Sequence, residues 1–284
     1  MTAPILNQDT PSRRPRLWLI SGTGEGPPLA RVLLRRGWRL RVQVVGPEAA
    51  RAYPMDPHLE LVVGPLAGAA AVAAAIGQAR RQQQPYRWLV DASHPFASRI
   101  SAALAEACAH QGQPLLRLAR PMLSGDEARI CADAAALANA LAPGERVLLA
   151  LGGRHLGSLL AGVPPIIAHA RLLPRPGGLR QALAAGLPAS RLACLQPGGD
   201  GAIEAALCRQ WRINTVIARQ SGGVSEALWR RLCRRQHHRL LLLARPSEPP
   251  GVEALPLAQL LVRLGSPEAP PGGSAWSPQT TSAP

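Results

Sequence analysis

Three glycines follow a short apolar run near the start of the chain, in the stretch SGTGEG that begins at Ser21. Glycine allows a tight turn and lets the backbone approach an anion closely. A helix that begins there offers free N–H groups and the positive end of its dipole, and Pro27 and Pro28 suit its first turn. The spacing G-x-G-x-G departs from the dinucleotide fingerprint, because Pro27 stands where the third glycine would be. The stretch is therefore compatible with two interpretations, a phosphate-binding loop and an ordinary tight turn.

A second group of chemically capable side chains lies in VDASHPFASRIS, residues 90–101. An apolar run typical of a strand ends at Asp91, and a helical pattern begins at Ser98. Pro95 favours an extended conformation for His94 at the corner between them. A carboxylate, two hydroxyl groups and an imidazole thus crowd one strand end. This density favours a functional site over an ordinary surface histidine.

The second half of the chain contains three further loops after apolar runs, LGGRHL, HARLLPRPG and ARQSGG. Glycines precede Arg154 and His155 in the first loop and follow Ser221 in the third, so both loops can offer backbone amides to an anion at a helix N-terminus. Arg171 in the second loop and Arg219 in the third can face carboxylates. Simple solvation of these arginines is the alternative.

Composition limits the classes of function. All 32 basic side chains among the 284 residues are arginines, and the formal net charge is +15. Without lysine, the chain cannot form a Schiff base, hold pyridoxal phosphate covalently or supply a Walker-type lysine. The positive charge favours an anionic partner such as a phosphate or a polycarboxylate. We do not expect a nucleic-acid partner, because only 3% of the residues are aromatic and no recognition module is evident.

The composition also predicts a globular, cytoplasmic protein with no membrane partner. Apolar residues make up 47% of the chain, but no run reaches the roughly 18 apolar residues of a membrane span. The first residues lack the apolar region of a secretion signal. No metal site is expected, because adjacent His237 and His238 suit capture of one ion poorly. The cysteines are scattered without a CxxC pair, so we expect buried, reduced thiols. They are Cys108, Cys131, Cys194, Cys208 and Cys233.

Strand candidates alternate with helical patterns, which predicts an α/β fold with parallel sheets flanked by helices. The predicted strands are 17–21, 39–45, 59–63, 88–91, 115–118, 147–151, 166–168, 191–195, 215–218 and 240–244. The predicted helices are 28–36, 66–80, 98–111, 178–185, 201–212, 224–235 and 256–264. Two series of strands imply two Rossmann-like domains, 16–120 and 121–264, between flexible tails at 1–15 and 265–284. Ligands of such sheets bind beyond the carboxyl ends of the strands, where the loops above lie.

Taken in order, these stretches resemble the precorrin-6A reductase family of cobalamin biosynthesis. That family typically opens with a strand and GGTxE, and this chain has SGTGE, with Ser21 in place of the first glycine. The family motif DATHPFA is matched by DASHPFA at residues 91–97, and an Arg-Pro pair is matched at Arg120. A late KxSGG segment is matched by RQSGG from Arg219, and the likeness spans residues 16–246.

Two departures from the family pattern bear on the predicted contacts. Arg219 stands where many members have lysine, so the cation is kept. After the second strand many members have SLAGR, whereas this chain has VGPEAAR at residues 45–51. The cofactor contacts of that loop therefore do not follow from the family pattern.

The resemblance implies reduction of precorrin-6A, or its cobalt form, with NADPH, at an active site in the cleft between the two domains. Hydride passes to one carbon of a ring C=C/C=N system and a proton to its neighbour. No acidic residue ends the second strand, where NAD enzymes often hold the ribose, so Arg51 is expected to meet the 2′-phosphate of NADPH. The implied cofactor-binding residues are Gly22, Thr23, Gly24, Glu25, Gly26, Arg51 and Ser93.

The same resemblance implies roles for the other side chains. His94 donates the proton or, with Asp91, orients the nicotinamide, and solvent is an equal alternative as the proton source. The substrate is an anionic corrinoid precursor with many carboxylates, which arginine can pair with bidentately. The implied substrate-binding residues are Arg120, Arg154, Arg171, Arg219, Ser221 and Gly222.

Other functions stay compatible with the sequence. One is a different NAD(P)-dependent oxidoreductase on a two-domain α/β frame, and another is a tetrapyrrole-binding protein without catalysis. NADPH binding by the isolated protein separates the carrier from the enzymes. An RNA-binding protein would instead show steeply salt-dependent affinity for generic RNA.

Overall fold

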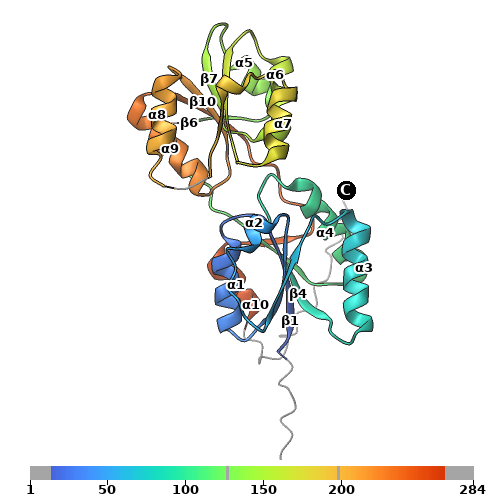
Figure 1. The fold of residues 1–284 in the computed structure, drawn as a ribbon. Coiled ribbons are helices and arrows are strands. Elements are labelled where there is room, and N and C mark those ends of the chain that lie inside the picture. Colours follow the sequence, from blue (N-terminus) through green and yellow to red (C-terminus); the bar gives the residue numbers. More distant parts are fainter. Residues whose placement is uncertain (1–13, 126–127, 197–198, 266–284) are drawn as a thin grey trace, which may run out of the picture. The chain divides into compact units, whose positions relative to one another are not determined.

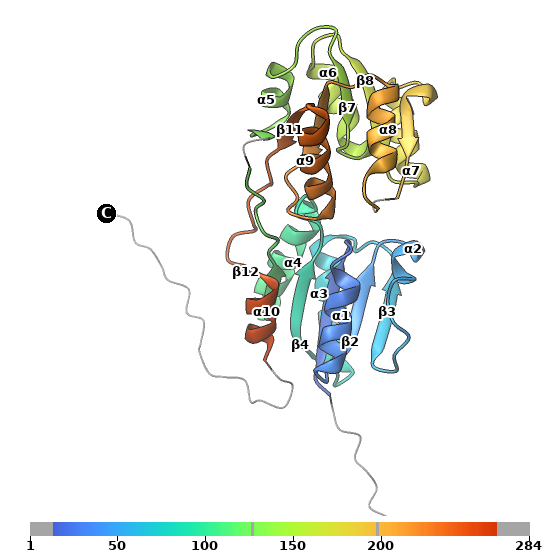
Figure 2. The same cartoon turned by 90° about the vertical axis from the view of Figure 1, so that its left-hand side faces the viewer.

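The computed structural model describes residues 14–125, 128–196 and 199–265. The described residues form two compact units, of which the first comprises those up to Ala119 together with those from Glu248 onward, and the second comprises those between Arg120 and Ser247. Each unit contains one six-stranded sheet with helices against it (Figures 1 and 2). None of the helices in these ranges has the length and apolar character that crossing a membrane requires.

The first unit is built on a sheet in which every described strand pair is parallel. In sheet order the strands are β12 (Glu253–Leu255), β5 (Leu115–Leu118), β4 (Tyr86–Ala92), β1 (Arg16–Ser21), β2 (Arg39–Val44) and β3 (Leu59–Val63). The helices are α1 (Gly26–Arg35), α2 (Pro47–Ala50), α3 (Gly68–Arg81), α4 (Ser98–Gln111) and α10 (Leu257–Leu264).

Alternation along β1 divides the core of the first unit between the two faces of the sheet. Leu17 and Leu19 pack with α1 and α10, whereas Trp18 packs with α3 and α4. Figure 1 shows α1 beside α10, and α3 and α4 across the sheet from them. In α1 the buried Leu29, Ala30, Leu33 and Leu34 recur at helical spacing, which makes one apolar stripe toward the sheet.

The second unit repeats this architecture, and its described strand pairs are also parallel. Its strands, in sheet order, are β6 (Ala128–Cys131), β11 (Arg239–Leu243), β10 (Thr215–Arg219), β7 (Arg146–Leu149), β8 (Ile167–Leu172) and β9 (Leu192–Cys194). Its helices are α5 (Ala134–Asn139), α6 (Leu156–Gly162), α7 (Pro176–Ala184), α8 (Ala202–Gln210) and α9 (Val224–Gln236). The short 3-10 helices are η1 (Gly153–His155) and η2 (Ala189–Arg191). One face is covered by α5, α6 and α7, and the other by α8 and α9.

The structure confirms the predicted α/β class with two parallel sheets, and it contains each predicted strand. The edge strands β6 and β12 and the short helices α2 and α5 were not predicted. Strand β8 runs to Leu172 and not to residue 168, so Arg171 belongs to the strand and not to the loop after it. The predicted tails lie outside the described residues, except for residues 14, 15 and 265.

The end of the chain corrects the predicted domain boundary. Residues 248–264 were predicted in the second domain, but β12 pairs with β5 of the first sheet. Leu260 and Leu264 of α10 are buried in the core around Leu17. The chain therefore returns to the first unit after Ser247.

Candidate active site

The strand order of each sheet reverses at one point, and the candidate loops lie at these points. In the first sheet, β1, β2 and β3 proceed in one direction, whereas β4 and β5 proceed in the other. The glycine turn after β1 and the HPF corner after β4 (residues 93–97) therefore flank the switch point, where open α/β sheets bind ligands. In the second sheet, the strand order reverses between β7 and β10. The loops after these two strands, which contain Arg154 and Arg219, therefore flank the switch point of that sheet.

The glycine turn is tightly packed at its end and open at its tip. A Cβ on Gly26 would lie 1.9 Å from Ser21 Oγ and 2.2 Å from the Tyr53 hydroxyl, so only glycine fits where α1 begins. A Cβ on Gly22 or Gly24 would have no neighbouring heavy atom within 4 Å. The tip therefore leaves room beside the N-terminus of α1, as a phosphate group requires. The turn therefore has room for a phosphate group despite the irregular glycine spacing.

The other predicted cofactor residues lie along the same edge of the first sheet. Thr23 Oγ1 donates to the Ala92 carbonyl at 3.4 Å, which links the glycine turn to the end of β4. Arg51 is exposed in the loop after β2, directly after α2. Glu25 is the residue before α1. Burial raises the pKa of Tyr53, and the neighbouring Ser21 hydroxyl partly offsets this, so the phenol stays protonated at neutral pH.

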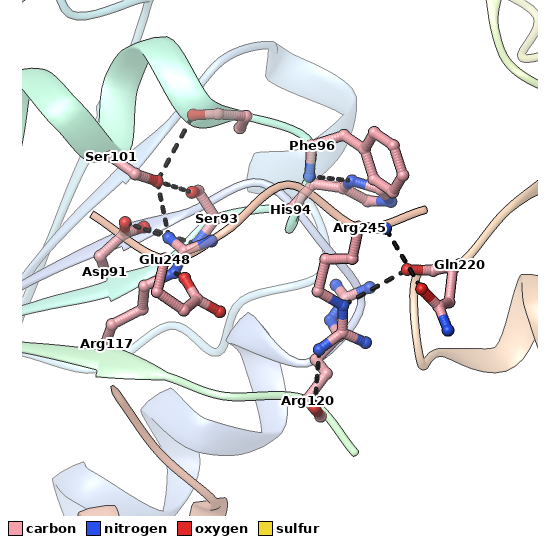
Figure 3. A network of polar contacts seen from close by, with 11 residues as sticks. Asp91, Ser93, His94, Phe96, Ser101, Arg117, Arg120, Gln220, Arg245 and Glu248 are labelled. Carbon is pink, nitrogen blue, oxygen red and sulfur yellow. Dashed lines mark hydrogen bonds and ion pairs between the residues drawn. The ribbon is translucent and has the colours of Figure 1, made fainter. Parts of the chain in front are cut away.

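The HPF corner fixes the orientation of a half-buried imidazole (Figure 3). The Phe96 amide donates to His94 Nδ1 at 3.1 Å, and the Ala97 amide donates to the His94 carbonyl at 2.7 Å. Because Nδ1 accepts a hydrogen bond, the neutral ring carries its proton on Nε2. In this tautomer, Nε2 is the donor nitrogen of the His94 ring.

Asp91 and Ser93 are buried beneath this corner, and their contacts hold it in place. Asp91 Oδ1 accepts from the Ser93 amide at 2.9 Å, and Oδ2 pairs with Arg117. The Ser93 hydroxyl lies 3.3 Å from Ser101 Oγ of α4. Both side chains are thus engaged inside the protein, and the catalytic role of Asp91 and the cofactor-binding role of Ser93 stay predictions.

Two arginines and a histidine gather at the switch point of the second sheet. Burial and the charge of Arg154 lower the pKa of Arg219 to about 10, so it remains charged at neutral pH. Burial and these two arginines also lower the pKa of His155. A Cβ on Gly152 would lie 3.3 Å from Arg219 Nη2, which shows how closely the loop passes the guanidinium. This electropositive cluster favours an anionic ligand.

The loop at Ser221 and Gly222 is held by side chains of its own unit. The Gly222 amide donates to Glu226 Oε2 of α9 at 2.7 Å, and the Ser221 carbonyl accepts from Arg120 Nη1 at 3.4 Å. Gly222 has a φ of 65°, and a Cβ there would lie 2.0 Å from the Pro121 carbonyl oxygen. The amide that we predicted for substrate is therefore engaged by a buried carboxylate, and Arg120 packs onto the same loop.

Arg171 differs from its predicted position at the substrate. It is buried in β8, with Nη2 3.3 Å from Oε1 of Glu204 in α8, which is also buried. A buried guanidinium needs such a partner to offset the loss of its hydration. We therefore leave Arg171 out of the proposed substrate site.

The cysteines match the predicted core thiols in four of five cases, since only Cys194 is exposed. Burial raises the pKa of Cys108, Cys208 and Cys233 to about 12, which keeps these thiols protonated and unreactive. Within the described ranges, three or more potential metal ligands do not gather at any point.

Two residues of the first site were missed in the sequence. Arg117 interrupts the apolar run LLRL of β5, and the strand register places it beside Asp91. A single arginine between leucines, next to a strand that ends in aspartate, was a usable signal of a buried ion pair. Tyr53 had no such signal, because the fold of the loop after β2 alone brings it to Ser21.

The match to a known family covers both sheets and all of these loops. Residues 16–262 match the family model described as "Precorrin-6x reductase CbiJ/CobK". The chain belongs to this family. As a precorrin-6x reductase family member, the protein is an oxidoreductase that acts on a CH–CH group.

Individual members of the precorrin-6x reductase family align over nearly their whole length. The cobalt-precorrin-6A reductase of Synechocystis sp. is 31% identical over 250 residues, which cover 86% of this chain and 94% of the relative. The precorrin-6A reductase of Rhodococcus erythropolis is 28% identical over 250 residues, with 84% and 93% coverage. A solved structure described as CobK precorrin-6A reductase has a TM-score of 0.71 and 26% identity, covering 91% of this chain and 100% of that chain.

Proposed function

We propose that this protein reduces precorrin-6A, or its cobalt form, with NADPH in cobalamin biosynthesis. The observation that carries this proposal is that the glycine turn and the HPF corner lie at the same edge of the first sheet. These two loops follow adjacent strands at the switch point of the first sheet, and Thr23 joins them through the Ala92 carbonyl. A cofactor held on the glycine turn therefore extends toward His94.

The choice of NADPH over NADH rests on the loop after β2. The strand is followed by Val45 and Gly46, so no acidic residue ends it at the position that often binds a ribose 2′-hydroxyl, and the nearest carboxylate of the loop is that of Glu48 in α2. The exposed guanidinium of Arg51 lies at the end of that loop and suits a 2′-phosphate. The phosphates that join the two nucleosides fit the open tip at Gly22 and Gly24.

The chemistry divides between cofactor and protein. NADPH supplies the hydride when it is bound. The protein holds the reactants in line and excludes competing orientations, which contributes several kcal/mol to lowering the barrier. His94 directs its Nε2–H toward the reactants and hydrogen-bonds an oxygen of the nicotinamide amide or of the substrate.

The neighbouring carbon receives its proton from solvent in this proposal. His94 Nδ1 accepts the hydrogen bond from the Phe96 amide, so this nitrogen carries no proton that it could transfer. A neutral imidazole is a weak acid at Nε2 and a good hydrogen-bond donor. We therefore assign His94 to orientation and not to proton donation.

Substrate recognition is assigned to the electropositive cluster of the second unit. Precorrin-6A carries many carboxylates, and the positive charge of Arg154 helps to lower the pKa of Arg219, so an anion bound beside Arg219 would offset this repulsion. Arg120, near Ser221, is a further candidate. Because guanidinium groups pair with carboxylates in a fixed geometry, they can also orient a rigid ring.

The test is anaerobic incubation of the protein with metal-free precorrin-6A and NADPH, followed optically. We expect nicotinamide absorbance to fall in step with the change in the spectrum of the macrocycle, and faster with NADPH than with NADH. A protein that binds the macrocycle without consuming NADPH would be a carrier, and the proposed function would then be wrong. Parallel incubation with the cobalt form identifies the preferred substrate.

A further inference from the structure

A guanidinium is buried beneath the HPF corner, at a position with no assigned function. Arg117 of β5 is 3% exposed. It pairs with the carboxylates of Asp91 and Glu248, and its Nη1 lies 2.6 Å from Ser101 Oγ of α4 (Figure 3). One side chain thus joins β4, α4 and the start of the segment that returns to the first unit.

The two carboxylates differ in their dependence on Arg117. The Asp91 side chain is 2% exposed, so it relies on the guanidinium to offset its lost hydration. The Glu248 side chain is 33% exposed and keeps contact with water. Removing the positive charge of Arg117 therefore leaves the Asp91 carboxylate buried without a cationic partner. Removing the charge of Glu248 leaves the buried Asp91–Arg117 pair intact.

Asp91 transmits the position of Arg117 to the corner. While Oδ2 pairs with the guanidinium, Oδ1 accepts from the Ser93 amide at 2.9 Å, which fixes the backbone immediately before His94. The Ser93 hydroxyl is held in turn near Ser101, which also contacts Arg117. The guanidinium therefore touches both supports of the residue that precedes His94.

We propose that Arg117 is a positioning residue of the reductase, which orients His94 by holding Asp91 and Ser101 beneath the HPF corner. This role rests on the proposed function, in which the His94 imidazole directs the reactants. Glu248 also pairs with Arg117, but its partly exposed carboxylate contacts neither Asp91 nor Ser101 in this network and is not needed for the proposed role.

The experiment compares Arg117→Met, Arg117→Lys, Asp91→Asn and the double variant R117M/D91N with Glu248→Gln as control. We expect Arg117→Lys to fold because it keeps the positive charge beside Asp91, but a compact ammonium lacks the fork that reaches Asp91, Ser101 and Glu248 together. We expect kcat to fall about tenfold or more in the Arg117 and Asp91 variants, with KM for NADPH within about threefold, since one charge-assisted contact is lost. Glu248→Gln should keep kcat within about twofold of wild type, because its exposed charge contributes little.

Coupling between the two positions separates indirect action from direct contact with the reactants. If Arg117 acts through Asp91, R117M/D91N loses no more activity than the worse single variant. The proposal would be overturned if the fold-loss in kcat of the double variant equalled the product of the two single-variant losses. An unchanged kcat in both Arg117→Lys and Arg117→Met would also overturn it.

A spectroscopic readout keeps this test independent of the reductase assignment. The imidazole nitrogen NMR shifts of His94 in the full-length protein should show the single Nε2–H tautomer, and both Arg117 variants should show a mixture. An unchanged His94 spectrum in these variants would refute the positioning role even in an active enzyme. A wild-type protein with the expected spectrum but no reductase activity would refute the proposed function alone.

Discussion

At the scale of single residues, substitution of the His94 imidazole tests the proposed mechanism most directly. Its tautomer is set by the Phe96 amide, and its backbone is set by the Ala97 amide and by the ion pair beneath it. An imidazole with one fixed ring nitrogen on an anchored backbone has little freedom to adapt to a misplaced ligand. Its contribution should therefore appear in the rate and not in the affinity.

We predict that His94→Ala lowers kcat about 10- to 100-fold, which corresponds to one lost directional hydrogen bond. The dissociation constant of NADPH should change less than about threefold, because the phosphates bind at the glycine turn and not at the corner. Steady-state kinetics and an NADPH titration measure the two effects. His110→Ala, an exposed position near the end of α4, is the matched control and should behave as wild type. An unchanged kcat in His94→Ala would remove the imidazole from the mechanism.

Residue roles could be read from the sequence only in part. The glycine turn and the HPF corner were found there, because their chemistry lies in one continuous stretch. The engagement of Gly222 by Glu226 was not predicted, although a glutamate at the third helical position typically caps the preceding amides and was a usable signal. The pairing of Arg171 with Glu204 was not readable, because 33 residues separate the two and only the fold joins them.

At the scale of elements, the turn between β1 and α1 combines a tight end with an open tip. We predict that Gly26→Ala destabilises the protein by about 1–3 kcal/mol, because its Cβ would overlap Ser21 and Tyr53. Gly24→Ala should leave the free energy of unfolding within about 0.5 kcal/mol of wild type, since its Cβ meets nothing. Chemical denaturation measures both.

The same pair of variants tests the cofactor cradle. Gly24→Ala should weaken NADPH binding despite normal stability, because its Cβ enters the space that the phosphates need. Equal NADPH affinity in wild type and Gly24→Ala would mean that the cofactor phosphates bind elsewhere.

The loops after β7 and β10 should act together on the substrate. We predict that Arg219→Gln raises KM for precorrin-6A about tenfold through the loss of one charged contact, with NADPH affinity unchanged. Arg234→Gln, which removes an exposed charge from α9, serves as the control for net charge. Equal KM values for the two variants would show that only general electrostatic attraction, and no specific contact, operates at Arg219.

The elements themselves were predictable where they are long and periodic. Helix α4 begins and ends where predicted, and β1, β2 and β3 are displaced by at most one residue. The strands that were missed, β6 and β12, have four and three residues and lie at sheet edges. Strands this short carry too few apolar positions to show a period of two.

At the scale of the whole molecule, the chain leaves the first unit after Ala119 and returns at Glu248. Sequence order hid this return, because a helical pattern at 256–264 continues the alternation of the second unit. Burial of Leu260 beside Leu17 shows where the helix belongs. The first unit is thus completed only by the end of the described chain.

We predict that Leu260→Ala destabilises the first unit by about 2–5 kcal/mol, as expected for a cavity at a fully buried leucine. Amide hydrogen exchange should accelerate in β1 and β5 while β7 and β10 keep their protection. Val262→Ala, at a position 78% exposed, should change neither. If amide exchange became faster only in β7 and β10, α10 would pack on the second sheet, and its assignment to the first sheet would be wrong.

The most direct measurement follows the transferred hydrogen itself, using NADPH deuterated at the position that leaves as hydride. The protein is incubated anaerobically with this cofactor and precorrin-6A, and the product is analysed by mass spectrometry and NMR. We predict one deuterium on one ring carbon of the reduced macrocycle, with the neighbouring hydrogen drawn from solvent. Reduced product without deuterium, or folded protein that binds both ligands and forms no product, would contradict the account.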